Sequence, residues 1–142
     1  MSKLNSNILA LGRCSTQFRS EKMAACGLKA CHTSYLRNIC DNPGISQDKL
    51  SQIIYFNKSN VARQCAILEE LGYIARIPSA TDKRVLELYP TDKALALLPH
   101  VLQIMQEWDE LLTGDLTPEE TETVNRVLDK MKQKAGNWMN EH

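Results

Sequence analysis

The sequence predicts a mainly α-helical fold with one small β hairpin, and three observations support this class. Apolar side chains recur at helical spacing along most of the 142 residues, and only 6 Gly and 5 Pro interrupt them. Residues 73–89 instead favour two short strands around a polar loop. Two short predicted helices, separated by a tight turn, come directly before this hairpin. That order of elements is a winged helix-turn-helix, here within a total of six predicted helices.

Composition limits the class of protein. Hydrophobic residues make up 43% of the chain, which is typical of a globular protein with a core. No apolar run approaches the roughly 20 residues of a membrane span, and the N-terminal segment has no long apolar core or clear cleavage site. We therefore expect a cytoplasmic protein that does not enter a membrane. The five cysteines, an odd number, favour reduced thiols over a disulfide framework.

The first two helices are expected over residues 5–25 and from Leu28 to about Ile39. Gly27 is a good stop for the first helix. Apolar residues from Leu28 onward share one face of the second helix, and the turn-forming residues 41–44 end it. Ile45 is expected to add one residue of strand beside the later hairpin.

The predicted helix-turn-helix occupies residues 46–71. Ser46 is a good N-cap for its first helix, and residues 55–57 form the turn. Either Asn57 or Ser59 can cap the second helix, and Gly72 ends it. Polar residues near the start of this second helix lie opposite its apolar face and form a candidate reading surface.

The remaining elements are the hairpin and two long helices. Strands are expected over residues 73–77 and 84–89, with a loop at residues 78–83. A fifth helix runs from Thr91 to about residue 112. Thr117 to Glu120, with Pro at the first helical position, form a capping box that opens the last helix.

Three motifs carry a resemblance to a known family. They are Leu-Glu-Glu-Leu-Gly-Tyr-Ile at residues 68–74, Asp-Lys-Arg at residues 82–84, and Thr-Asp-Lys-Ala at residues 91–94. In this order, behind a predicted recognition helix, they resemble the MarR family of bacterial winged helix-turn-helix transcription regulators. The flanking helices agree with the family in order and length.

The resemblance implies a single domain over residues 1–142 that forms a homodimer. The DNA-reading head would span about residues 28–90, and helices at about 5–25 and 92–140 would form the dimerisation base. The apolar stripes of these terminal segments include Trp108, Met131, Trp138 and Met139, and a monomer of this size would struggle to cover them. Two-fold symmetry makes the expected operator, in double-stranded DNA, a pseudo-palindrome.

The candidate DNA contacts fall in three places. Arginine can fork to guanine, and asparagine or glutamine to adenine, so the start of the second helix is expected to read base edges. Those residues are Lys58, Ser59, Asn60, Arg63 and Gln64. Ser46 and Gln47 can offer hydroxyl, amide and backbone N–H groups to phosphate. The alternative interpretation is an ordinary solvated helix face.

The wing supplies the third place. Arg84 is expected in a minor groove, where the potential favours guanidinium, and Asp82 can pair with it and hold its angle. Thr81 and Lys83 are expected on phosphate. The alternative is an ordinary surface ion pair.

Charge is the main argument against DNA. The net charge is zero, but residues 1–45 carry a balance of +4, residues 46–93 of +1, and residues 94–142 of −5. Acid thus gathers away from the predicted head. A winged-helix module that binds protein and never DNA remains an alternative. No nucleophile motif is present, so we expect no enzyme and no cofactor.

The resemblance also implies a repressor released by a small effector. The effector pocket of the family lies between helices one, two and five, where Arg13, His32 and Tyr35 would suit a small aromatic or lipophilic acid. A satisfied, half-buried histidine is the alternative for His32. Redox- or zinc-responsive regulation is the alternative for the whole protein.

The metal and redox candidates are weaker. Cys26, Cys31 and His32 flank a turn and could meet a metal together with His100, but this ligand pattern is incomplete. We therefore predict no resident metal. Peroxide-sensing relatives place a reactive cysteine nearer the start of the first helix than Cys14, so buried structural thiols are the expected role of the cysteines.

Overall fold

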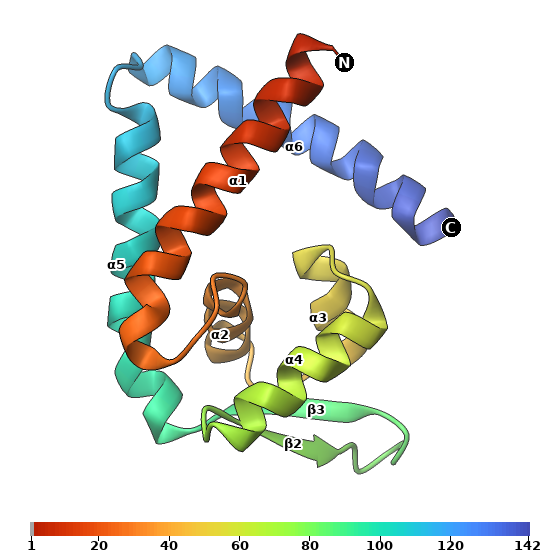
Figure 1. Ribbon diagram of the computed structural model, residues 1–142. Coiled ribbons are helices and arrows are strands. Elements are labelled where there is room, and N and C mark those ends of the chain that lie inside the picture. The colour runs from red at the N-terminus through yellow and green to blue at the C-terminus, as the bar shows by residue number, and fades with distance from the viewer. Residues whose placement is uncertain (1) are drawn as a thin grey trace. The chain divides into compact units, whose positions relative to one another are not determined.

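The computed structural model describes residues 2–142 and confirms the predicted mainly α fold with a small sheet (Figure 1). Its elements are α1 (Lys3–Met23), the 3-10 helix η1 (Ala24–Cys26), α2 (His32–Asp41), β1 (Ile45–Ser46), α3 (Gln47–Ile54), α4 (Lys58–Glu70), β2 (Ile74–Pro78), β3 (Leu86–Pro90), α5 (Asp92–Thr113) and α6 (Pro118–Glu141). The chain divides into two compact units. The first unit ends at Met105, and the second begins at Gln106. No helix of the described residues is both long and apolar enough to cross a membrane.

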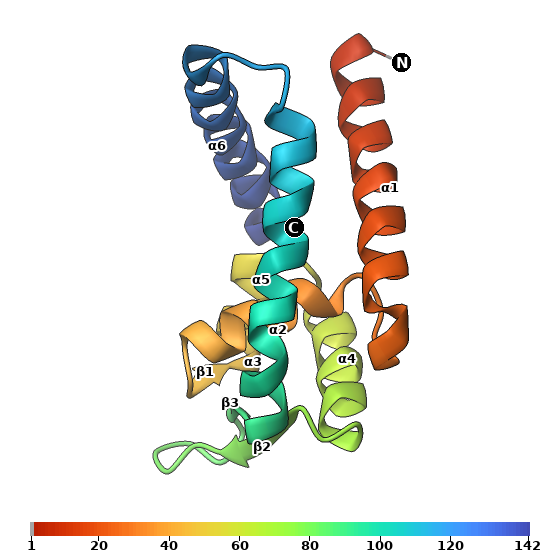
Figure 2. The same ribbon diagram turned by 90° about the vertical axis from the view of Figure 1, so that its left-hand side faces the viewer.

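The sheet of the first unit is antiparallel and has the order β1-β3-β2. Ile45 pairs with Leu88 on one side of β3, and Arg76 pairs with Leu88 on the other. The expected strand residue at Ile45 is therefore confirmed. Figure 2 shows the β2–β3 hairpin at the lower end of this unit, where its loop projects beyond α3 and α4.

The core of the first unit lies where α2, α3, α4 and β3 meet. Its fully buried side chains include Leu36, Ile39, Leu50, Val61, Leu68 and Leu88. The end of α1 and the first half of α5 also contribute buried apolar residues to this core. One face of the helix-turn-helix is thus fixed by apolar packing, and its other face stays free for polar side chains.

Short-range capping bonds fix where the helices begin. The Ser46 side chain accepts from the backbone N–H of Lys49 at 3.0 Å. Asn57, and not Ser59, caps α4 by accepting from the N–H of Asn60 at 2.7 Å. Thr117 and Glu120 make both bonds of the predicted capping box at the start of α6.

Two predicted boundaries were wrong. The second helix begins at His32 and not at Leu28, because the preceding residues form a turn in which the N–H of His32 donates to Lys29 O at 3.1 Å. Leu28 is nevertheless buried, so its apolar side chain indicates a position in the core and not a position in a helix. Strand β3 begins at Leu86 and not at Arg84, because the N–H of Val85 donates to Asp82 O and closes the wing loop.

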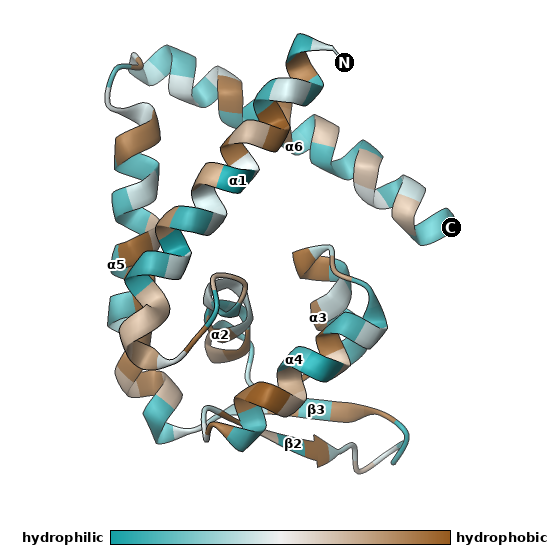
Figure 3. Ribbon diagram, viewed as in Figure 1, coloured by the Kyte–Doolittle hydropathy of each residue, from teal (hydrophilic) through white to brown (hydrophobic). Residues whose placement is uncertain are grey.

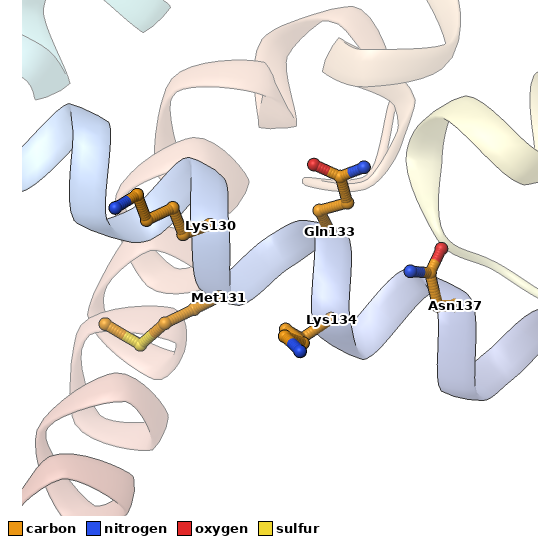
Figure 4. Close-up of a pocket in the computed structure, with 5 residues that line it drawn as sticks. All are labelled: Lys130, Met131, Gln133, Lys134 and Asn137. Atoms are coloured by element: carbon orange, nitrogen blue, oxygen red, sulfur yellow. The ribbon is translucent and has the colours of Figure 1, made fainter.

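The second unit contains α6, on which apolar and polar side chains alternate. Figure 3 shows this mixture of brown and teal residues along the helix. Figure 4 shows a hollow whose lining residues all stand on α6 itself, namely Lys130, Met131, Gln133, Lys134 and Asn137. A hollow with walls from one helix does not enclose a ligand, so it is no candidate site.

Candidate nucleic-acid interface

The start of α4 presents the polar surface that the sequence predicts. Lys58, Ser59 and Arg63 are exposed, and Asn60 is half-buried. The Arg63 guanidinium donates from Nη2 to Asn60 Oδ1 at 3.3 Å, which orients it along the helix. Asn57 joins this surface, because its Oδ1 also accepts from the Ser59 hydroxyl at 3.0 Å. These side chains form one compact polar set, with both donors and acceptors, in the N-terminal half of the helix.

Gln64 stands apart from that set. It is half-buried, and its Oε1 lies 2.8 Å from Nε2 of the buried His32. The Nδ1 atom of His32 accepts from the backbone N–H of Lys29 at 3.0 Å. The ring is therefore neutral with its proton on Nε2, which donates to Gln64. Gln64 thus ties α4 to α2, although the sequence placed it among the base readers.

Burial explains why the His32 ring is neutral. Desolvation lowers the pKa of the imidazole, the bond to Gln64 opposes that shift, and Lys29 adds to it. The sequence left open that His32 is a satisfied histidine and not an effector ligand. Its geometry fits that alternative, since both ring nitrogens make hydrogen bonds within the chain.

The start of α3 lies beside the wing. The Gln47 Oε1 atom accepts from Nη1 of Arg76 at 3.4 Å. Gln47 and Arg84 also line one small hollow of about 70 Å³. Ser46 uses its oxygen as the helix cap, and its hydroxyl hydrogen remains able to donate. The two predicted phosphate-contacting regions are therefore neighbours in the folded unit.

The predicted pair at the wing is present. Arg84 donates from Nε and Nη2 to the two carboxylate oxygens of Asp82 at 3.1 and 3.2 Å, and its backbone N–H donates to Asp82 Oδ1 at 3.1 Å. The Arg84 side chain is 91% exposed. The arginine lowers the pKa of the Asp82 carboxyl through these hydrogen bonds. Thr81 and Lys83 are exposed beside the pair.

Sequence reasoning missed Arg76 and Glu69. Arg76 donates from Nε and Nη2 to Glu69 Oε1 at 3.3 and 3.1 Å, which lowers the pKa of that carboxyl. The pair joins β2 to the last turn of α4. Its members are seven residues apart across a turn, so no helical or strand spacing signals it.

The effector candidates are not gathered in one place. Arg13 is exposed on α1, whereas His32 and Tyr35 are buried in the core. The rings of His32 and Tyr35 meet edge to face, with centroids 6.2 Å apart, and the Tyr35 ring lies 6.2 Å from that of Phe56. Among the described residues, the Tyr35 hydroxyl is a buried polar group without a hydrogen-bond partner. Burial raises the pKa of this phenol.

The metal and thiol candidates do not form a centre. Across residues 2–142, no three His, Cys, Asp or Glu side chains are placed to hold a metal ion. The Nε2 atom of His100 lies 3.3 Å from the backbone oxygen of Lys22. Desolvation raises the pKa of Cys31 and Cys40, and raises that of the buried Cys65 to about 12, which keeps these thiols protonated. Cys14 is exposed on α1, and Cys26 is half-buried.

A recognition helix, the helix before it and a three-stranded wing define a winged helix-turn-helix protein. The profile described as "MarR family" matches residues 27–85. The chain is 31% identical over 96 residues to the transcriptional regulator HosA of Escherichia coli, a match that covers 68% of this chain and 71% of HosA. The chain belongs to the MarR family of transcriptional regulators, which is not a family of enzymes.

Solved structures agree with this membership. A MarR protein from Peptoclostridium difficile superimposes with a TM-score of 0.95 at 26% identity, over 99% of this chain and 93% of that one. A putative MarR family regulator from Listeria monocytogenes, solved in complex with a 26mer DNA, superimposes with a TM-score of 0.91 at 23% identity, over 96% of this chain and 91% of that one. The match to this chain spans about two thirds of the length of the curated relatives.

Proposed function

We propose that this protein is a cytoplasmic, sequence-specific DNA-binding repressor that acts as a homodimer on a pseudo-palindromic operator and is released by a small acid. The observation that carries the DNA-binding part is the pair of exposed arginines, Arg63 on α4 and Arg84 on the wing, each oriented by a neighbouring side chain. The Listeria relative was solved with a 26mer DNA, which supports the same use of this fold.

The two arginines suit different parts of a duplex. Arg63 stands at the end of α4 that a major groove admits, and its five donors match the acceptors of guanine. Arg84 stands on a hairpin loop narrow enough for a minor groove. Lys58, Ser59, Asn60, Thr81 and Lys83 would add contacts to bases and phosphates from these same two regions. Ser46 and Gln47 would hold phosphate between them.

The experiment is duplex binding by the purified protein. Fluorescence anisotropy with a fragment of its own promoter should show specific binding that weakens steeply with salt. Arg63→Ala and Arg84→Ala should each reduce the affinity at least about tenfold and leave the oligomeric state unchanged. Arg37→Ala, which breaks the exposed Arg37–Asp41 pair on α2, is the matched control. A wild-type protein without salt-dependent binding would instead fit a protein-interaction module.

Exposed apolar residues support the homodimer. On α1, Leu4 and Leu11 are about half-exposed, and in the second unit Leu111 and Trp138 are more than 60% exposed. Exposed large apolar side chains of this kind, present in both units, are typical of a protein–protein interface. Analytical ultracentrifugation of wild-type protein and of Trp138→Lys should show a dimer and a weakened dimer, because a charge at a buried interface is unfavourable.

Tyr35 supports the proposal of an effector. A phenol hydroxyl that is buried without a partner leaves a hydrogen bond unmade, and an aromatic acid that enters beside the Phe56 ring would supply the missing partner. Salicylate and benzoate should raise the melting temperature of wild-type protein and reduce its affinity for DNA. Tyr35→Phe removes only the hydroxyl and should reduce both effects. No shift in either protein would contradict release by such an acid.

A further inference from the structure

Arg76 joins three separate elements of the head. Its Nε and Nη2 atoms and its backbone N–H all donate to the Glu69 carboxylate, at 3.1 to 3.3 Å. Its Nη1 atom donates to Gln47 Oε1 at 3.4 Å. Glu69 is in the last turn of α4, Arg76 is in β2, and Gln47 is the first residue of α3. One guanidinium therefore connects the recognition helix, the wing and the helix before the turn.

The burial of Arg76 separates this pair from the other ion pairs of the head, although Glu69 is as exposed, at 41%, as Asp82 at 40%. The Arg76 side chain is only 23% exposed, compared with 70% for Lys58 in its pair with Asp48 and 91% for Arg84. A half-sheltered guanidinium that makes several hydrogen bonds has a defined geometry, whereas pairs of two exposed side chains contribute little. Arg76 is thus built into the structure as a fixed connection.

The position of Arg76 in the sheet makes this connection relevant to the wing. Arg76 is opposite Leu88 in the β2–β3 register, in the middle of the hairpin that continues to Arg84. A change in the angle between α4 and β2 would therefore move the wing loop relative to Arg63. The two grooves that Arg63 and Arg84 would enter lie at a fixed separation on a DNA duplex. The angle between α4 and β2 therefore affects whether both arginines can bind at the same time.

We infer that Arg76, held by Glu69 and Gln47, is a positioning residue that sets the angle between the recognition helix and the wing. This inference rests on the proposed DNA-binding function. It differs from a direct role in which Arg76 leaves its partners and binds a phosphate.

Glu69→Gln separates the two roles. This substitution removes a negative charge, retains the positive charge of Arg76, and weakens the fork between them. A phosphate-binding Arg76 would then bind DNA more tightly. If Arg76 is a positioning residue, it would no longer fix the angle between α4 and the wing, and operator affinity should fall about fivefold. Arg76→Lys, which keeps the charge but not the planar fork, should resemble Arg76→Gln in the positioning role and wild type in the phosphate role.

A double-mutant cycle with the wing supplies the second readout. Affinities for the promoter fragment would be measured for wild type, Arg76→Gln, Arg84→Ala and the double variant, and for the same set with Arg63→Ala in place of Arg84→Ala. In the Arg76→Gln background, Arg84→Ala should cost much less affinity than in wild type, because the wing is already misplaced. The effect of Arg63→Ala should stay unchanged. Urea unfolding of each variant would show that the fold is intact.

Two results would overturn the inference. One is a Glu69→Gln protein that binds the promoter as tightly as wild type or more tightly. The other is independent, additive loss from Arg76→Gln and Arg84→Ala in proteins of wild-type stability. Failure of the proposed function looks different, since wild type itself would then show no salt-dependent binding.

Discussion

The start of α4 and the loop of the wing both present an exposed arginine, yet they are held by different means. Helix α4 rests on Val61, Cys65 and Leu68, all completely buried. The wing loop instead relies on local bonds around Asp82, and Ile77 near the end of β2 is 49% exposed. The start of α4 is thus fixed by the core, whereas the wing loop is held by its own turn. Loss of a core contact and loss of a turn contact should therefore have different consequences.

The largest expected effect concerns the anchor of α4. Leu68→Ala removes a fully buried side chain and leaves a cavity, so the free energy of unfolding should fall by about 2–5 kcal/mol. Ile77→Ala in the wing is the control, and its exposed side chain should change stability by less than about 1 kcal/mol. Urea unfolding at one fixed protein concentration measures both, because dimer stability depends on concentration. Equal losses would show that the wing is as firmly packed as the helix.

The second effect concerns the cap of α4. Asn57→Ala leaves the N–H of Asn60 without its acceptor and should reduce stability by about 0.5–2 kcal/mol. Asn57→Asp keeps an oxygen acceptor and favours the helix dipole, so it should restore most of the loss. Ser59→Ala is the control, since Ser59 donates only to the capping side chain. The unfolding midpoints of the three variants test this order.

The caps could be predicted because each depends on residues close in sequence. Ser46, Asn57 and Thr117 bond to N–H groups three residues ahead, and side-chain type alone favours that bond. The Asp82–Arg84 pair could be predicted for the same reason. Local chemistry therefore determined much of the fold and part of the candidate interface.

The long-range contacts could not be predicted in this way. Gln64 meets His32 across 32 positions of sequence, and on a helical projection it is simply polar. Arg76 and Glu69 meet because β2 turns back along α4, and their residue types equally fit a solvated surface. Leu28 misled the prediction of α2, since periodicity cannot tell a buried turn residue from a helical one. Only the tertiary arrangement decides these three cases.

The third effect is a pH dependence of the link between α2 and α4. Burial lowers the pKa of His32 below its ordinary value of 6.5, so below that pH the unfolded chain binds more protons at this residue than the folded one. The stability contributed by neutral His32 should thus be complete above about pH 6.5 and lost as pH falls toward the lowered pKa. Thermal unfolding between pH 5 and pH 8 tests this.

The control for this pH dependence is His32→Gln, which cannot titrate. Its stability should vary less than that of wild type in the same pH window, because the glutamine side chain carries no titratable proton. Identical pH profiles would mean that His32 does not titrate in this window. A profile with the opposite sign would contradict the neutral state of His32 in the folded protein.

The smallest effect on stability, and the most informative about the wing, concerns Asp82. Asp82→Ala removes an exposed partner, so the unfolding midpoint should not change measurably. Its loss releases Arg84 from its orientation and removes a negative charge near the phosphates. Non-specific binding should therefore strengthen while promoter binding does not, and the ratio of the two affinities should fall. Asp82→Asn retains an acceptor for the Arg84 N–H and should lie between Asp82→Ala and wild type. Anisotropy with promoter and random duplexes at two salt concentrations gives this ratio. If both affinities rise by the same factor, Asp82 contributes only charge, and the wing needs no preset angle.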